Sequence, residues 1–296
     1  MHIEPIINTV YDCFTSNFIT ACNFLSRNYY LWFSNMMTYK NYNRYEKYDV
    51  MMNYHGLKCI EQKLSQEECC SLVKKNIVQS MPVIIGTDIY QCSWNRYYQQ
   101  KHNEHFLLVT DYQNGLFTCL DTYVSNNTYT FSWDEIALQS MLCSTFEIKE
   151  SQEDLEGIFK VIRNYLLRYE EELNSSEINA QSLSEGIMEH CDFNDEYDIT
   201  MHEPIRQIKI HEDRRYCYLE MIQKIEHQFN INLSSIQSYL LDIISVLKDM
   251  KRTTLVHILS TNRKQKDIHT YIQKIIDLDK IMVSHMKNIV NDTVGD

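Results

Sequence analysis

The sequence predicts an α+β domain over residues 1–150 and an all-helical region over residues 151–296. Up to about residue 150, short β-branched and aromatic segments alternate with amphipathic helical ones. Beyond that point the apolar residues recur at helical spacing only. The chain of 296 residues contains 6 Gly and 3 Pro, and so few chain breakers favour long regular segments.

Three helices of the first domain begin at recognisable caps. Asp12 precedes a helical pattern and is a suitable N-cap. Ser65 and Glu68 form a Ser-x-x-Glu capping box, and Ser132 and Glu135 form a second one. The apolar stripe of the first helix consists of Phe14, Phe18, Cys22 and Leu25.

Strands are expected at four places in the same domain. Residues 81–90 are apolar and rich in β-branched side chains, as in a buried strand. The segment "HNEHFLLVTDYQNGLFTCLDTY" (102–123) reads as two strands joined by a tight turn. Shorter strands are predicted at 128–131 and 145–150.

The region after residue 150 reads as helices. Residues 174–205 are polar and mixed, and we expect them to form a linker or loop. Three helices are predicted after it, over 213–229, 232–260 and 265–292. Before it, one helical face carries Leu155, Ile158, Phe159, Ile162, Leu166 and Tyr169.

The bulk properties exclude several classes of function. The formal net charge of −12 argues against nucleic acid or an anionic membrane as the main partner. No apolar run predicts a transmembrane helix, and the N-terminus lacks a signal-peptide pattern. We therefore expect a cytoplasmic protein with reduced thiols. Its 10 cysteines include no Cys-x-x-Cys pair, which argues against a zinc ribbon or a thioredoxin-like motif.

His105 and Asp121 are the first candidates for chemistry. His105 lies near the start of the first strand of the predicted hairpin, and Asp121 lies near the end of the second strand. A carboxylate beside an imidazole fixes its tautomer and stabilises the imidazolium, as in catalytic triads. The alternative is an ordinary hairpin with two polar residues at its strand ends.

The turn of this hairpin decides between the two interpretations. A two-residue turn at 114–115 would pair Gln113 with Leu116 and place the two side chains on opposite faces. A three-residue loop would pair Tyr112 with Leu116 and make them diagonal neighbours on one face, with Cβ atoms roughly 7–8 Å apart. A functional pair therefore requires, in this interpretation, the three-residue loop.

Cys13 is the best candidate for a nucleophile. It follows Asp12 at the start of the first helix, where the helix dipole favours a thiolate and the backbone N–H of Cys13 could contribute to an oxyanion hole. The alternative is a small apolar residue at a helix start. Cys92 is the second candidate, because it is also near His105 in sequence but follows a strand.

The order of cysteine, histidine and aspartate resembles that of papain-like cysteine hydrolases. The block "MPVIIGTDIYQCSWNRYYQQKHNEHFLLVTDYQNGLFTCLDTY" (81–123) is similar to the N-terminal domain of the BtrH family of butirosin biosynthesis. In that family a strand ends in Asp, a loop rich in Tyr and Trp follows, and the next two strands carry His and Asp. The "YDC" that opens the first helix fits as well, and the resemblance covers residues 5–150.

The resemblance implies a papain-like domain with an antiparallel sheet and a cysteine acyltransferase activity in natural-product or antibiotic biosynthesis. The family's named member moves an acyl group from an acyl carrier protein thioester to an amine of an aminoglycoside. By this resemblance Cys13 is the nucleophile, His105 the general base and acid, and Asp121 the orienting residue. No cofactor is implied; the acyl-phosphopantetheine of an acyl or peptidyl carrier protein is the substrate, and a small amine or hydroxyl compound is the acceptor.

Several alternatives remain open to the same residues. Water as acceptor would make the protein a thioesterase, and an amine of the substrate itself would make it a cyclase. A cysteine peptidase or amidase is compatible with the same triad order. A binding module that keeps the fold without catalysis is a further alternative.

The oxyanion position departs from the papain-like pattern. These enzymes usually carry a Gln six residues before the cysteine, where this chain has Ile7, so Asn8 is the nearest amide.

The Tyr/Trp-rich loop supplies candidate substrate contacts. Asp88 could hold a substrate amine or cap the loop that follows it. Trp94, Tyr97 and Tyr98 could line an acyl or pantetheine channel, or anchor that loop.

Two further features have a weaker chemical interpretation. His102 and His105 form His-x-x-His, but no cysteine or carboxylate is placed to complete a metal site, so no metal is expected. The basic segments 206–215 and 262–266 could dock an acidic carrier protein, or they could be solvated surface loops.

Overall fold

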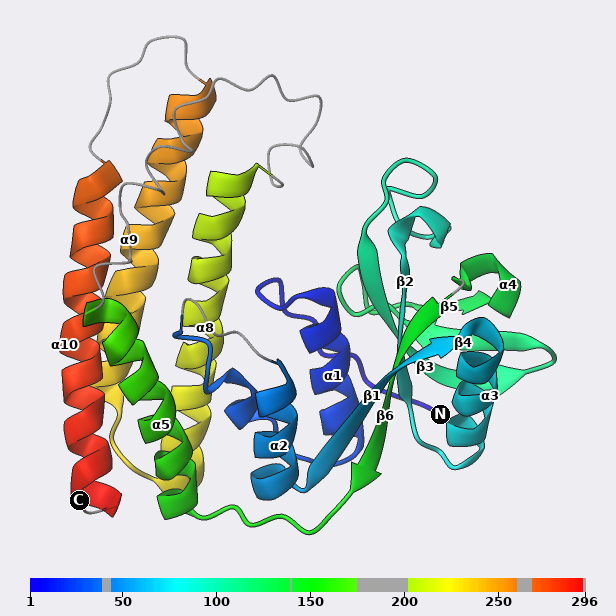
Figure 1. The fold of residues 1–296 in the computed structure, drawn as a ribbon, viewed down its shortest axis with the longest axis horizontal. Helices are drawn as coiled ribbons and strands as arrows, with labels where there is room; N and C mark the ends of the chain where they lie inside the picture. Colours follow the sequence, from blue (N-terminus) through cyan, green and yellow to red (C-terminus); the bar gives the residue numbers. More distant parts are fainter. Residues whose placement is uncertain (39–43, 139, 175–201, 260–267, 295–296) are drawn as a thin grey trace. The chain divides into compact units, whose positions relative to one another are not determined.

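The chain folds into two compact units (Figure 1). The first unit comprises Met1–Tyr29 and Tyr45–Glu153, and the second comprises Tyr30–Arg44 and Asp154–Asp296. Residues 30–44 were expected in the first domain, but the 3-10 turn η1 (Tyr30–Phe33) packs against α8 of the second. The computed structural model describes residues 1–38, 44–138, 140–174, 202–259 and 268–294.

The described strands form one six-stranded sheet in the order β1-β6-β2-β3-β4-β5, and all neighbouring strands are antiparallel. The first unit is therefore an α+β fold, as the sequence predicts. The strands span Leu57–Ser65 (β1), Val83–Asp88 (β2), Glu104–Gln113 (β3), Leu116–Leu120 (β4), Thr128–Phe131 (β5) and Ser140–Ile148 (β6).

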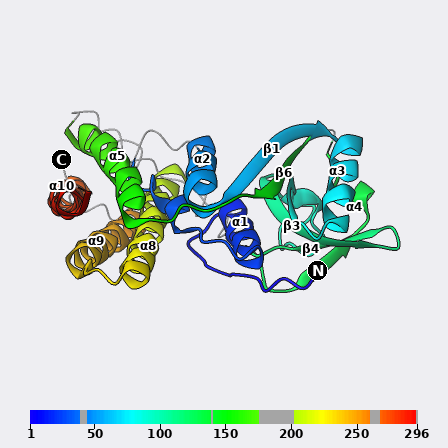
Figure 2. The same cartoon turned by 90° about the horizontal axis from the view of Figure 1, so that it is seen from below.

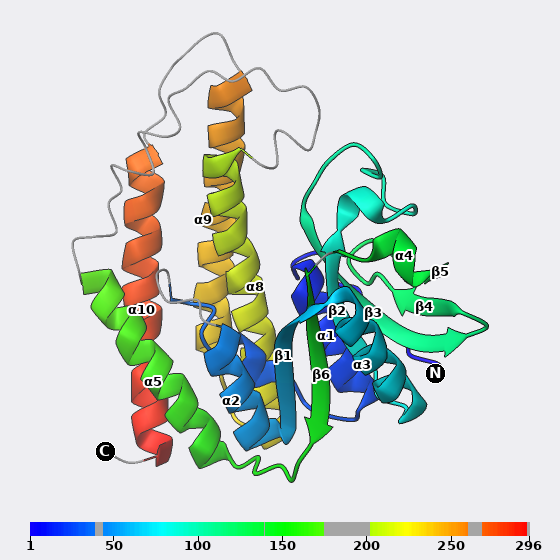
Figure 3. The same cartoon turned by 45° about the vertical axis from the view of Figure 1, so that its right-hand side comes forward.

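Two strands at one edge of the sheet differ from expectation, and Figure 3 shows them side by side. β6 begins at Ser140, five residues before the predicted start at 145. β1 was not expected at all, because its second half, 61–65, is mostly polar and exposed. β1 pairs with β6 alone, so this half needs no apolar side chains. Gly56 permits the pairing, since an added Cβ there would lie 2.5 Å from the carbonyl oxygen of Lys149.

α1, α3 and α4 begin where the caps predict, whereas α2 was not expected. Ser65 and Glu68 form the predicted capping box. α1 packs against β3, where the ring of Phe14 meets that of Phe106 edge-on at 5.1 Å. α3 packs against β1, β2, β3 and β6, where Cys69 and Val73 join the buried core. The helices span Cys13–Phe24 (α1), Arg44–His55 (α2), Gln66–Val78 (α3) and Trp133–Ile136 (α4).

The turn between β3 and β4 has two residues, so the predicted three-residue loop is wrong. Gln113 pairs with Leu116 across Asn114 and Gly115. Both turn residues have positive φ, 52° and 84°, the conformation that Asn-Gly favours in a type I′ hairpin.

A β-bulge nevertheless restores the alignment that the three-residue loop was expected to give. The register shifts by one residue between Val109 and Asp111, so that Leu108 pairs with Leu120. Extending this register by one pair places Leu107 opposite Asp121. His105 and Asp121 therefore share a face, although the turn alone would have separated them.

Four long helices form most of the described part of the second unit, and Figure 2 shows them close to end-on. α8 packs on α9, α9 on α10, and α10 on α5. They span Leu155–Asn174 (α5), Glu203–Phe229 (α8), Ser234–Leu259 (α9) and Ile268–Val294 (α10).

α8 begins ten residues before the predicted start at 213. Pro204 stands in its first turn, and Ile205 and Ile208 are buried one turn apart. The predicted linker over 174–205 lies largely outside the described residues. Among the helices of the described ranges, none is both long and apolar enough to cross a membrane.

A buried ion pair joins three helices of the second unit. The Nη2 group of Arg215 donates to Asp279 Oδ2 at 2.9 Å and to the hydroxyl of Tyr169 at 2.8 Å. All three side chains are fully buried. Losing one partner would leave an uncompensated charge in the interior, which is more costly than losing both.

We predict that Asp279→Ala lowers the free energy of unfolding of the helical unit by about 3–5 kcal/mol. Denaturation followed by circular dichroism measures this loss. Asp277→Ala in the same helix is the control, because Asp277 is exposed and its loss should change stability by less than about 0.5 kcal/mol. The double variant Arg215→Met/Asp279→Leu should recover part of the loss. Equal effects of Asp279→Ala and Asp277→Ala would contradict a stabilising role for the pair.

Candidate active site

Cys13 is the first residue of α1. Asp12 caps this helix by accepting a hydrogen bond from the backbone N–H of Thr15 at 2.6 Å. The thiol therefore lies at the positive end of the helix dipole, which favours negative charge on sulfur. Cys13 is also partly exposed, so that a substrate can reach it.

His105 and Asp121 form the pair that the sequence suggests. His105 Nε2 lies 2.8 Å from Asp121 Oδ2, and both residues are buried. The imidazole also interacts with the Cys13 side chain. Because Nε2 is bonded to Asp121, Nδ1 is the ring nitrogen left for the thiol. The three predicted catalytic residues are therefore brought together.

The environment of His105 favours the imidazolium. Burial by itself disfavours this charged form, but hydrogen bonds to Asp121 and Cys13 and their negative charges outweigh burial and raise the pKa of His105 to about 10. At neutral pH the ring therefore carries a proton, which makes it a partner for a thiolate.

Trp94 contacts the aspartate of the pair. Its indole Nε1 donates to Asp121 Oδ2 at 2.9 Å, and its ring stacks on Tyr129 with centroids 4.7 Å apart. Asp121 Oδ2 thus accepts hydrogen bonds from two side chains. These contacts also tie the loop to the sheet, which was the alternative role, and the role of Trp94 in an acyl or pantetheine channel stays a prediction.

Asn17 is a residue of this site that sequence reasoning missed. Its Nδ2 group donates to the carbonyl oxygens of Cys13 and Phe106, each at 2.8 Å. Its Oδ1 accepts from the hydroxyl of Thr122 at 3.1 Å. One fully buried amide therefore ties the backbone of the cysteine to the neighbours of His105 and Asp121. The available signal was an asparagine one helical turn after Cys13 in an apolar stretch.

Asp88 closes the loop that follows β2. Its Oδ1 accepts from the backbone N–H groups of Tyr90 at 2.9 Å and Asn103 at 3.1 Å, and its Oδ2 lies 2.8 Å from His102 Nδ1. Although burial opposes ionisation, these hydrogen bonds keep the pKa of Asp88 below its usual value. This geometry favours the capping role over the binding of a substrate amine.

His102 and His105 do not share a site. His102 stacks on Tyr90 with ring centroids 4.2 Å apart and bonds to Asp88, whereas His105 bonds to Asp121. In the described ranges, no group of three or more His, Cys, Asp or Glu side chains is arranged to hold a metal ion.

The remaining predicted contacts lie in loops of the first unit. The guanidinium of Arg96 lies over the ring of Tyr97, 4.6 Å from the ring centroid. The hydroxyl of the partly exposed Tyr98 accepts a hydrogen bond from Gln99 Nε2 at 3.1 Å. Asn8 Oδ1 accepts from the backbone N–H of Val10 at 3.2 Å. The NH2 group of Asn8 is therefore the part of this amide that an oxyanion would use.

Cys92 is poorly suited to be the nucleophile. It is fully buried, and its Sγ lies 3.6 Å from the carbonyl oxygen of Asp88. Burial and the nearby charges of Asp121 and Asp88 raise the pKa of the Cys92 thiol to about 12. The reactive thiolate is therefore scarce at neutral pH.

The basic segment 206–215 is part of α8 and not a surface loop. Its cations bond within the second unit: Arg206 to Glu203 at 2.7 Å, Lys209 to Asp213 at 2.6 Å, Arg214 to the carbonyl oxygen of Thr38 at 3.1 Å, and Arg215 to Asp279 at 2.9 Å. These contacts weaken its interpretation as a docking patch. The second basic segment, 262–266, lies outside the described residues.

Comparison of the chain with models of known protein families found no match, and comparison with curated proteins found no significant match. Neither comparison assigns a family, so the arrangement of the residues themselves carries the functional proposal.

We predict that Asn17→Ala lowers the free energy of unfolding of the first unit by about 1–3 kcal/mol, because it leaves buried polar groups unpaired. It should also slow the alkylation of Cys13 by iodoacetamide and shift the pH profile of that reaction. Asn23→Ala is the control, since Asn23 is an exposed asparagine of the same helix. If Asn17→Ala lost stability but kept the wild-type alkylation profile, the amide would support the fold alone.

We also predict that His105 makes stability fall with rising pH. The folded protein holds the imidazolium proton up to a pKa of about 10, whereas an unfolded histidine loses it near about 6.5. Unfolding therefore releases a proton between these values, and the free energy of unfolding decreases there by at most about 1.4 kcal/mol per pH unit.

Urea denaturation of wild type and His105→Gln across this pH range isolates the effect as the difference between the two proteins. His102→Gln is the control, because that ring is largely exposed, and it should keep the wild-type pH dependence. Parallel curves for wild type and His105→Gln would show that His105 does not hold its proton in this way.

Proposed function

We propose that the first unit is a papain-like cysteine acyltransferase, similar to the BtrH family. It would move an acyl group from a carrier-protein thioester to an amine or hydroxyl acceptor in natural-product biosynthesis. The observation that carries the proposal is the imidazole of His105, which is held by Asp121 on one side and faces Cys13 on the other.

The acylation step uses the charges of this triad. The Cys13 thiolate attacks the thioester carbonyl, and the new oxyanion is stabilised by the backbone N–H of Cys13 and the amide of Asn8. The bond between the carbonyl carbon and the pantetheine sulfur then breaks. His105 gives its proton to the departing thiol, which leaves a neutral imidazole beside acyl-Cys13.

The deacylation step follows from a change in the charge around His105. Acylation removes the Cys13 thiolate, one of the groups that raise the pKa of His105, so that the pKa falls and the neutral ring persists. This ring takes a proton from the acceptor amine or hydroxyl as the acceptor attacks the acyl carbon. The Cys13 thiolate leaves, and the acylated acceptor and the original ion pair result. Asp121 orients the ring throughout, and Trp94 holds Asp121.

We predict that wild-type protein gains the mass of the acyl group when it is exposed to an acyl-carrier thioester, whereas Cys13→Ala does not. Cys92→Ala is the control, because it removes another cysteine near Asp121 and should still be acylated. His105→Gln should slow acylation by a factor of about 100 or more, since the proton transfer to the leaving thiol is lost. Intact-mass spectrometry measures each case, and an adduct that persists in Cys13→Ala would refute the nucleophile assignment.

The fate of the acyl-enzyme separates the related activities. Release of the adduct by added amines supports the transferase. Release in water alone indicates a thioesterase, and release as a ring indicates a cyclase. Cleavage of peptides without reaction with thioesters would indicate a peptidase or amidase and would contradict the proposal.

A further inference from the structure

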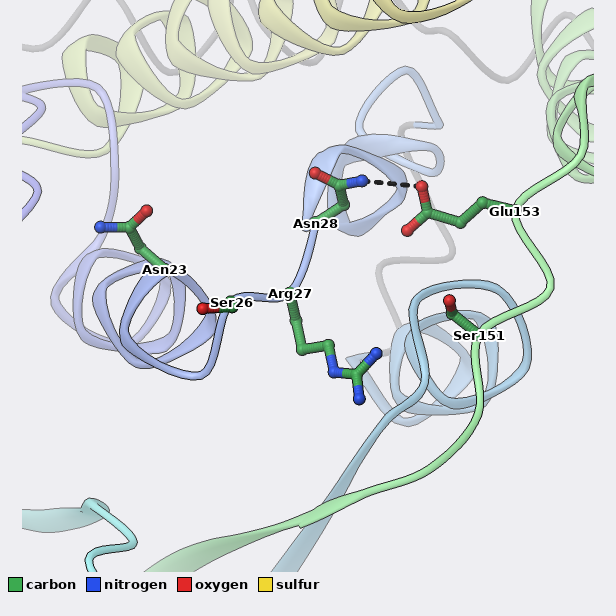
Figure 4. Close-up of a pocket in the computed structure, with 6 residues that line it drawn as sticks. All are labelled: Asn23, Ser26, Arg27, Asn28, Ser151 and Glu153. Carbon is green, nitrogen blue, oxygen red and sulfur yellow. Dashed lines mark hydrogen bonds between the residues drawn. The ribbon is translucent and has the colours of Figure 1, made fainter.

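A polar cavity of about 560 Å³ lies in the first unit at the C-terminal end of α1. All of its lining residues are polar and belong to that unit, and Figure 4 shows them: Asn23, Ser26, Arg27, Asn28, Ser151 and Glu153. Cys13 opens the same helix, so at 1.5 Å per residue the cavity lies roughly 16 Å from the thiol. It is therefore distinct from the candidate active site.

The end of α1 directs two polar side chains to this cavity. Ser26 has a positive φ of 53°, a left-handed conformation that usually favours glycine. The backbone N–H of Arg27 then bonds to the carbonyl oxygen of Cys22 at 2.9 Å and closes the turn. At the position of Arg27 such turns commonly carry an apolar residue that packs on the helix. This chain instead places a hydroxyl and a guanidinium at the lining of the cavity.

Among the described residues, Arg27 has no counter-ion. In the described part of the chain no carboxylate pairs with its guanidinium, and its buried Nε has no hydrogen-bond acceptor. The carboxylate that lines the same cavity is engaged elsewhere. Glu153 Oε1 lies 2.6 Å from Nδ1 of the buried His55, and Glu153 Oε2 accepts from Asn28 Nδ2 at 2.7 Å (Figure 4). The guanidinium of Arg27 therefore has no direct ionic partner within the described part of the chain.

We propose that this cavity binds a small carboxylate ligand. The guanidinium of Arg27 would supply the charge and hydrogen bonds that carboxylates prefer, and the hydroxyls of Ser26 and Ser151 would supply further donors. Glu153 lines the same cavity, so a singly charged anion is favoured over a doubly charged phosphate. Binding of this ligand does not depend on the reaction that Cys13 performs.

Titration of the full-length protein with acetate, acetamide and inorganic phosphate at constant ionic strength tests the proposal. Chemical-shift changes in two-dimensional NMR report binding, and residues around the cavity should respond to acetate. Acetamide has nearly the same shape without the charge and should not bind. Preference for phosphate over acetate would overturn the carboxylate assignment.

Arg27→Gln should weaken acetate binding by about tenfold or more, because it removes the charge-assisted hydrogen bonds. Arg96→Gln is the matched control, since Arg96 is an exposed arginine in a loop of the same unit. If Arg27→Gln does not fold, Arg27→Lys keeps the charge without the planar fork and should bind acetate with intermediate affinity. If Arg27→Gln bound acetate as tightly as wild type, the site would be refuted. If only Arg27→Lys folds, acetate binding by Arg27→Lys equal to that of wild type would refute it.

Discussion

The buried amide of Asn17 is the interaction on which the arrangement of the first unit depends. A helix, a strand and the segment after the next strand each contribute one group to the candidate site. Asn17 bonds to the backbone of Cys13, to the backbone of Phe106, and to the side chain of Thr122. The separations among Cys13, His105 and Asp121 are thus fixed by hydrogen bonds one residue or one turn away from each reactive group, which leaves the reactive groups free for chemistry.

Burial and charge act in opposite directions at His105, and charge prevails. An imidazole in the interior would ordinarily stay neutral. Here Asp121 is fully buried beside it, so their attraction is screened little by water. Trp94 donates a second hydrogen bond to the same carboxylate oxygen. The fold therefore keeps the imidazolium of His105 beside the carboxylate of Asp121 at neutral pH. In an unfolded chain the same histidine would be mostly neutral at that pH.

The sequence predicts the elements of this unit better than their alignment. Capping residues and β-branched runs locate helices and strands, since these signals are local. The bulge between Val109 and Asp111 shifts the strand register by one residue and so offsets the effect of the two-residue turn. No local residue pattern predicts this bulge. The bonds from Trp94 to Asp121 and from Asn17 to Phe106 and Thr122 join residues far apart in sequence, so the periodicity of apolar residues does not reveal them. In the second unit, α8 was placed too late because only three apolar side chains, Pro204, Ile205 and Ile208, are buried in it before residue 213.

The carboxylate of Asp88 joins the two ends of the loop between β2 and β3, through Tyr90 at one end and Asn103 at the other. Lengthening a loop that is closed at its base costs little additional entropy. The residues between Trp94 and His102 can therefore be exchanged, extended or shortened while both strands keep their register. In a lineage descended from such a protein, new recognition surfaces would arise in this loop first, because variation there leaves the reactive residues in place.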